Sequence, residues 1–376
     1  MSGPLDGLKV VELAGLGAAP YACMLLADLG ADVLRLERGN PDAESEVSWD
    51  VLARSRPSVA VDLKNPAGRD LVLELCERAD VLVEGFRPGV AERLGLGPAE
   101  VHARNPRLVY GRLTGYGQEG PLAARAGHDI NYVAISGALW PIGRAGEPPT
   151  PPLNLVGDFG GGALFLALGV LAALYEVRRS GCGQVVDAAM IDGTASMTAL
   201  THAMLNAGFW IEERGTNLLD TGAPFYEVYE TRDGRFVAVG AIERKFYLAL
   251  LQGLGLEAHD LPDQMDRAHW PEVKERFRAI FQTRTRDEWD EVFADTDACV
   301  TPVLSLSEAT RHLHNVARGV FRPEDGLPNV APRFSRTPGA VRQPALTPGS
   351  GTHEGLGRWG VGAERLALLR DAGAFG

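Results

Sequence analysis

Hydrophobic residues in the first half of the chain form short strand-like runs separated by helical patterns. One helical pattern passes through Leu25, Leu26 and Leu29, and another runs from Ala67 to Ala79. The strand-like runs are Lys9–Leu13, Ala31–Leu36, Val59–Leu63, Val81–Val83 and Leu108–Leu113. Strands that alternate with helices predict an α/β domain with a doubly wound, mainly parallel (Rossmann-like) sheet and helices on both faces.

The second half of the chain predicts longer helices and then a smaller α+β domain. Gly160–Gly162 opens an apolar helix that runs to about Arg179, and a long helix is expected from about Met190 to Trp210. Two strand patterns flank Asp233-Gly234, which is typical of a β-hairpin turn. Further expected elements are the strand Gln184–Ala188, the hairpin strands 225–229 and 236–240, and the helices 271–281, 285–294 and 362–371.

These patterns predict four regions. A large domain spans residues 1–189, a linker helix region 190–227, and a small α+β domain 228–320. Beyond Pro323 the chain is rich in proline and glycine, so residues 321–376 are expected to return and pack on the large domain.

Composition narrows the class of protein. The chain has 376 residues, of which 45% are hydrophobic and 23% charged, as in ordinary soluble proteins. A net charge of −12 argues against general nucleic-acid binding. The longest apolar run, Ala163–Tyr175, falls short of the roughly 20 residues that cross a bilayer. No signal peptide is recognised, so a cytoplasmic protein without membrane contact is expected. Four widely spaced cysteines suit neither a zinc site nor a disulfide framework.

Basic residues cluster where predicted strands end. Ligands of doubly wound sheets bind beyond the carboxyl ends of the strands, and a ligand with several phosphates favours such a cluster. The sequence Gly15 to Pro20 resembles a dinucleotide-binding loop only weakly, because a proline occupies the third glycine position. The basic candidates are Arg38, Lys64, Arg87 and Arg93, with Arg54 and Arg56 before the third strand.

Two titratable residues, His128 and Asp158, lie in glycine-flanked segments. An imidazole and a carboxylate suit proton transfer at carbon, where one group removes a proton and the other returns one from the opposite face. Local hydrogen bonds in loops, or a helix N-cap at Asp158, are simpler alternatives. The cap does not explain the glycines Gly160–Gly162, which suit the close approach of a group such as an enolate oxygen.

Several segments carry a family resemblance. They are Leu5–Leu13, Leu26–Val33, Asp62–Lys64, Glu84–Gly89, Leu113–Gly117, Asp297–Val303 and Ala331–Arg336. Together they resemble the class III CoA-transferases, also called the CaiB/BaiF family, over nearly the whole chain. Three further segments are similar to the racemase branch of this family, which acts on α-methylacyl-CoA thioesters: Gly127–Tyr132, Asn154–Gly162 and Gly240–Glu243.

The resemblance implies interlocked homodimers, with active sites between the large domain of one subunit and the small domain of the other. It implies that His128 and Asp158 are the catalytic bases and that Glu243 of the partner subunit orients the histidine. It implies no cofactor, since CoA is part of the acyl-CoA substrate. The implied CoA contacts are Arg38, Val61, Asp62, Leu63, Lys64, Gly85, Phe86, Arg87, Arg93, Gly127, His128, Asp129, Ile130, Asn131 and Tyr132.

The expected reaction is racemisation of 2-methylacyl-CoA through an enolate. Neutral His128 and protonated Asp158 would exchange roles between the two epimers, and backbone N–H groups near Asp158 would stabilise the enolate. The alternative is CoA transfer between carboxylic acids with Asp158 as nucleophile. A metal site at His128, Asp129 and Asp158 fits no familiar ligand spacing, and a non-catalytic binding module has no need for the histidine opposite the aspartate. The acyl chain stays open.

Overall fold

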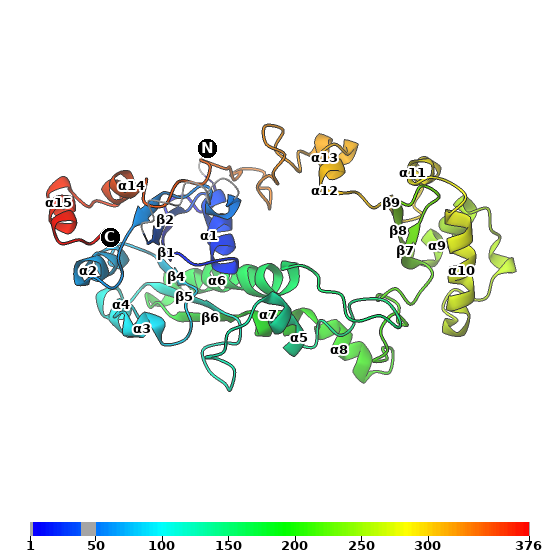
Figure 1. Ribbon diagram of the computed structural model, residues 1–376, viewed down its shortest axis with the longest axis horizontal. Helices are drawn as coiled ribbons and strands as arrows, with labels where there is room; N and C mark the ends of the chain where they lie inside the picture. Colours follow the sequence, from blue (N-terminus) through cyan, green and yellow to red (C-terminus); the bar gives the residue numbers. More distant parts are fainter. Residues whose placement is uncertain (1–2, 39–49, 376) are drawn as a thin grey trace. The chain divides into compact units, whose positions relative to one another are not determined.

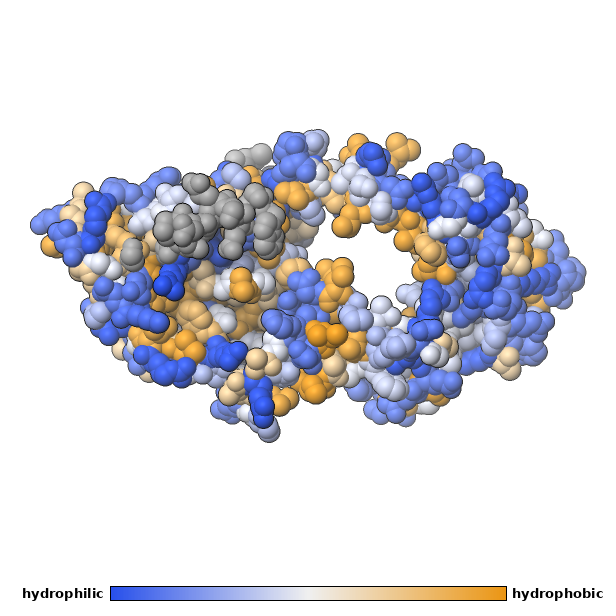
Figure 2. All heavy atoms as spheres, viewed as in Figure 1, coloured by the Kyte–Doolittle hydropathy of each residue, from blue (hydrophilic) through white to orange (hydrophobic). Residues whose placement is uncertain are grey.

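The computed structural model describes residues 3–38 and 50–375. The chain divides into two compact units. The first comprises Met1–Ser136, Pro152–Thr198 and Asn329–Gly376, and the second comprises Gly137–Pro151 and Ala199–Pro328. Hydrophilic residues cover most of the visible surface of both units, as Figure 2 shows, which fits the charged fraction of 23%.

The first unit is built on a parallel sheet of six strands (Figure 1), which confirms the predicted α/β class. The strand order β3-β2-β1-β4-β5-β6 reverses direction between β1 and β4, which is the point where doubly wound sheets bind ligands. The strands are β1 (Lys9–Leu13), β2 (Asp32–Glu37), β3 (Ser58–Ala60), β4 (Val81–Glu84), β5 (Val109–Thr114) and β6 (Val185–Ala189).

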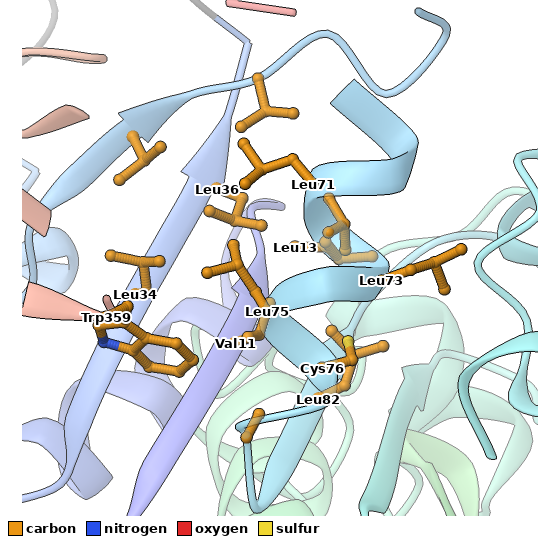
Figure 3. Close-up of a cluster of buried hydrophobic side chains, with 14 of the residues drawn as sticks. Val11, Leu13, Leu34, Leu36, Leu71, Leu73, Leu75, Cys76, Leu82 and Trp359 are labelled. Atoms are coloured by element: carbon orange, nitrogen blue, oxygen red, sulfur yellow. The ribbon is translucent and has the colours of Figure 1, made fainter. Parts of the chain in front are cut away.

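Successive side chains of a strand point to opposite faces of the sheet, and a hydrophobic cluster covers each face. Val11 belongs to a core cluster with α2 (Pro66–Cys76), α14 (Thr352–Arg358) and α15 (Ala363–Asp371). Figure 3 shows this cluster, in which Trp359 is 1% exposed. Val10 belongs to the opposite cluster, with α1 (Ala18–Asp28) and α6 (Phe165–Ser180). Shorter helices of this unit include α3 (Val90–Arg93), α4 (Pro98–Arg104), α5 (Asp129–Ile135) and the 3-10 turn η3 (Val51–Ala53).

Two arginines expected at the ligand site are instead part of this core. Arg56 bonds to the buried Glu12 at 2.6 Å, and Arg54 bonds to the buried Asp28 at 2.7 Å. Arg35 adds a second bond to Glu12 at 3.1 Å. The expectation that Arg54 and Arg56 serve an anionic ligand is therefore wrong, because their guanidinium groups compensate buried carboxylates.

The helix that carries Asp158 begins earlier than expected. It starts as the π-helix η4 (Leu155–Leu164) and continues as α6, so the chain is helical over Leu155–Ser180. This 26-residue helix is long and apolar enough to cross a membrane by length and composition, with a mean hydropathy of 1.8. The expectation of no such segment was wrong because it counted only the uninterrupted apolar run. Helices packed in the core of soluble proteins meet the same criterion.

The predicted long helix from Met190 to Trp210 is also wrong. The structure has α7 (Met190–Met197) and α8 (Ala199–Asn206), with a break at Thr198. The break coincides with the boundary between the two units. The apolar spacing alone gave no sign of it, since neither glycine nor proline stands there.

The second unit has a small antiparallel sheet with an aromatic core. The predicted hairpin is confirmed as β7 (Tyr226–Glu230) and β8 (Phe236–Gly240), and β9 (Val300–Pro302) adds a third strand. Its helices are α9 (Arg244–Gly253), α10 (Trp270–Phe281), α11 (Arg286–Phe293), α12 (Leu306–Ala309) and α13 (Leu313–Arg318), with 3-10 turns η5 (Ala258–Asp260) and η6 (Arg267–His269). The core rings include Phe225, Tyr229, Tyr247, Trp270, Phe277, Phe281 and Trp289.

Candidate active site

A cavity of about 510 Å³ opens beyond the carboxyl ends of β1, β4 and β5 in the first unit. It lies at the switch point of the sheet, where the loops after these strands diverge. The structure thus brings the two predicted bases, His128 and Asp158, into one cavity. Among its other lining residues are Gly17, Gly85, Phe86, Arg87, Tyr116, Arg125, Gly127, Tyr132 and Met190.

His128 stands at the start of α5 as its N-cap and is exposed to the cavity. The side-chain oxygen of Asn131 accepts the backbone N–H of His128 at 3.0 Å, which fixes the histidine against the first turn. The hydroxyl of Tyr132 donates to the carbonyl of Gly127. A β-carbon at Gly115 would lie 2.1 Å from the Tyr132 ring, so this glycine is needed to seat the ring.

Asp158 lies half-buried in the first turn of η4. A β-carbon at Gly17, whose φ is 68°, would lie 3.5 Å from Oδ2 of Asp158, so the loop after β1 faces the carboxylate. Burial raises the pKa of Asp158 above its usual value, and the neighbouring Asp129 raises this pKa further. Hydrogen bonding to Asn154 and the nearby His128 oppose the shift. A carboxyl group in this setting holds a proton more readily than a solvated one.

The backbone N–H of Asp158 is already occupied. It donates to Oδ2 of Asp129 at 2.7 Å. The expectation that N–H groups near Asp158 stabilise an enolate therefore fails for this N–H. The Asp129 carboxylate points into the protein and is 5% exposed.

The three glycines after Asp158 serve helix packing. A β-carbon at Gly161 would lie 2.4 Å from Oγ1 of Thr194, and one at Gly162 would lie 2.9 Å from Cγ of Met190. Both contacts are with α7, which packs closely on η4. The expectation that these glycines admit an enolate oxygen is replaced by this close helix crossing.

A second cavity, of about 460 Å³, lies beyond the carboxyl ends of β1, β2 and β3. Phe86 lines both cavities. Six predicted CoA contacts line the second cavity: Arg38, Val61, Asp62, Leu63, Lys64 and Phe86. Within the described residues, four predicted contacts line neither cavity: Arg93, Asp129, Ile130 and Asn131.

Several residues that line the first cavity were not predicted from the sequence, among them Gly17, Tyr116 and Arg125. Gly17 was considered only as part of a weak dinucleotide pattern, although its place after β1 at the switch point was a usable signal. Tyr116 packs edge-to-face on Tyr132, with ring centroids 4.9 Å apart. Arg125 lies in the loop before Gly127, where the sequence shows no strand end to mark it.

Glu243 belongs to the second unit. It is the N-cap of α9 and its side chain is exposed. Its predicted role beside a histidine stays a prediction. In the described part of the chain, no group of three or more His, Cys, Asp or Glu side chains is arranged to hold a metal ion.

Comparison with known proteins decides the family. CoA-transferase family III matches residues 5–354. The chain belongs to this family. It is 48% identical over 373 residues to the α-methylacyl-CoA racemase of Mus musculus, covering 98% of this chain and 96% of that protein. Identity to the Homo sapiens α-methylacyl-CoA racemase is 46% with the same coverage. The fold is similar to that of a CAIB/BAIF family protein from Brucella suis, with a TM-score of 0.82 and 24% identity over 96% of this chain and 100% of that chain.

Proposed function

We propose that this protein interconverts the (2R) and (2S) epimers of 2-methylacyl-CoA thioesters. The proposal is supported by its identity to the two racemases over nearly the whole chain. The observation that carries it is the placement of His128 and Asp158 in one cavity, together with the raised pKa of Asp158. A racemase needs one group that takes a proton from carbon and one that returns it.

The thioester makes the α-proton acidic because the carbonyl accepts the charge as an enolate. In one direction neutral His128 removes the α-proton and protonated Asp158 delivers its proton to the opposite face. In the other direction ionised Asp158 is the base and protonated His128 is the acid. Both directions start from a pair that holds one proton in total, so the two residues titrate as a unit.

The enolate oxygen needs hydrogen-bond donors. The N–H of Asp158 is committed to Asp129. α5 begins directly after His128, and the first N–H groups of a helix have no partner within the helix. We therefore assign the enolate donors to the start of α5.

The CoA moiety is proposed to span both cavities. Arg38 and Lys64 would contact its phosphates from the second cavity, and Arg87 would do so from the first. The shared residue Phe86 marks the passage between the cavities, so the thioester would reach His128. Arg93 is exposed at the end of α3 and would contribute a further positive charge near this path.

A second copy of the chain is proposed to complete the site as an interlocked homodimer. An exposed apolar stripe follows helical spacing along η4 and α6: Leu164, Leu168, Leu171 and Tyr175. A stripe of this kind is typical of a surface that another protein covers. In the dimer, Glu243 of the partner subunit would accept a hydrogen bond from His128 and fix its tautomer. Light scattering should give twice the monomer mass of 40.3 kDa.

The test is incubation with one epimer of a 2-methylacyl-CoA in D2O. Racemisation predicts loss of the α-proton NMR signal together with loss of optical purity. CoA transfer, in which Asp158 attacks the thioester and forms a mixed anhydride, predicts retained stereochemistry and passage of CoA to an added carboxylate. The second result would replace the proposal.

A further inference from the structure

Asp129 is a buried carboxylate whose bonding is incomplete. It is the first residue of α5, directly after His128, and is 5% exposed. Its Oδ2 accepts the N–H of Asp158 at 2.7 Å. Its Oδ1 is buried and has no hydrogen-bond partner among the described residues. No ion pair to Asp129 is formed within that same part of the chain. A buried carboxylate without a cation lowers the stability of the folded state. The presence of Asp129 at this position is therefore not explained by stability.

The backbone around Asp129 is shaped to let it come close to Asp158. A β-carbon at Gly157 would lie 2.6 Å from Oδ2 of Asp129 and 3.0 Å from Cγ2 of Val133. Any larger residue at 157 would push the carboxylate away from the N–H of Asp158. The close approach of Asp129 to the backbone of Asp158 therefore also requires glycine at position 157.

We propose that Asp129 is a positioning residue that tethers the backbone of Asp158 and keeps a negative charge beside its carboxyl group. The inference rests on the proposed racemisation and adds a residue to it. Because Asp129 follows His128 directly, its bond to Asp158 links the backbones of the two bases. Its charge favours the protonated form of Asp158, which is the form that delivers a proton to the enolate.

The groups that face Asp158 determine how its charge responds to pH. His128 and Asp129 come from the start of α5, Asn154 from the residue before η4, and Tyr132 from the first two turns of α5. Arg87 and Arg125 are the arginines that line the same cavity as Asp158. The acidic residue of α7, Asp192, acts instead on Asp187. Asp129 is thus the nearby anion that favours a proton on Asp158.

The experiment compares Asp129→Asn and Asp129→Ala with the unaltered protein. Asn keeps an oxygen for the N–H of Asp158 but removes the charge, whereas Ala removes both. Rates of racemisation are measured for each epimer across pH, and the Asp158 carboxyl band is titrated by difference infrared spectroscopy against Asp158→Asn. The ratio of kcat/KM for the two epimers must equal the equilibrium constant in every variant, which checks the kinetic data.

We expect Asp129→Asn to move the acid limb of the kcat/KM profile and the Asp158 carboxyl titration to lower pH, with KM unchanged. Asp129→Ala should also lower kcat by roughly 100-fold, because a misplaced base loses its alignment. Asp220→Asn is the matched control, since Asp220 is a buried aspartate of the second unit that accepts the N–H of Asn217 at 2.7 Å. It should leave both titrations in place.

The outcomes separate this inference from the proposed function. A raised KM with unmoved pH profile in Asp129→Asn would overturn the inference and favour a direct contact with CoA. Unmoved infrared titration in an active racemase would overturn it as well. A shifted infrared titration in a protein that does not racemise its substrate would support the positioning role and refute the proposed reaction.

Discussion

Two groups of carboxylates in the first unit differ in whether a neighbouring arginine compensates their charge. Glu12 is fully buried between Arg35 and Arg56, and Glu84 is fully buried against Arg112 at 2.7 Å. Asp129 and Asp158 lie beside each other, and no arginine or lysine pairs with either among the described residues. The first group compensates charge and holds the sheet together. The second leaves charge uncompensated beside a cavity, which is where a perturbed carboxyl group serves proton transfer.

The largest expected effect concerns the two proton-transfer groups, His128 and Asp158. His128→Ala and Asp158→Ala should each lower kcat for racemisation by about 1000-fold, because each removes one of two proton-transfer groups. Rates are measured by polarimetry for both epimers. The two-base mechanism is wrong if His128→Ala leaves racemisation intact while Asp158→Ala abolishes it.

Removing an arginine from the compensated carboxylates should lower the stability of the folded protein. Arg56→Met leaves Glu12 with one arginine and is expected to lower the free energy of unfolding by about 3 kcal/mol. Arg69→Met is the control, since Arg69 pairs with Asp70 at the surface and should cost less than about 1 kcal/mol. Denaturant unfolding measures both. Unchanged stability with a raised KM would restore Arg56 to the ligand site.

The approach of Asp129 to Asp158 can be broken without altering either residue. Gly157→Ala places a methyl group 2.6 Å from Oδ2 of Asp129 and should lower kcat by roughly 100-fold. Gly357→Ala in α14 is the matched control, because its β-carbon would meet no atom within 4 Å. Equal rates in the two variants would show that the Asp129–Asp158 bond is irrelevant to catalysis.

The smallest expected effect is the change in melting temperature when the ionisable group of Asp158 is removed. Folding raises the pKa of Asp158, so its contribution to stability is complete below its unfolded pKa and is lost as pH rises through the folded pKa. Asp158→Asn has no ionisable group at this position, so its stability does not fall with the ionisation of residue 158. The gain in melting temperature of the variant over the unaltered protein should therefore grow with pH across that interval. A gain that shrinks with rising pH would reverse the sign assigned to this carboxyl group.

Local patterns predicted the sheet well and the helix junctions poorly. The strand runs and the Asp233-Gly234 turn are properties of adjacent residues, and the structure confirms them. The residues around Leu155 and Thr198 do not mark the π-helix or the helix break, and the close packing of η4 on α7 joins segments that lie apart in the sequence. The reason for Gly160–Gly162 was missed for the same cause, since the α7 residues that their β-carbons would meet, Met190, Thr194 and Met197, lie far along the sequence.

The candidate site was predictable in its residue types and less so in their contacts. His128, Asp158 and the strand-end residues Arg38, Lys64 and Arg87 line the two cavities. Arg54 and Arg56 carry the same charge near the same edge but face buried acids, and only the packed structure separates the two cases. Asp129 lies in a predicted contact segment, yet its side chain points to the backbone of Asp158.

The central claim is that His128 and Asp158 exchange protons with the α-carbon from its two sides. The most direct measurement follows deuterium in the first turnovers of a single 2-methylacyl-CoA epimer in D2O. The product epimer should carry deuterium at the α-carbon while the remaining substrate keeps its protium. Deuterium entering the substrate at unchanged optical purity, or CoA passing to an added carboxylate, would contradict the account.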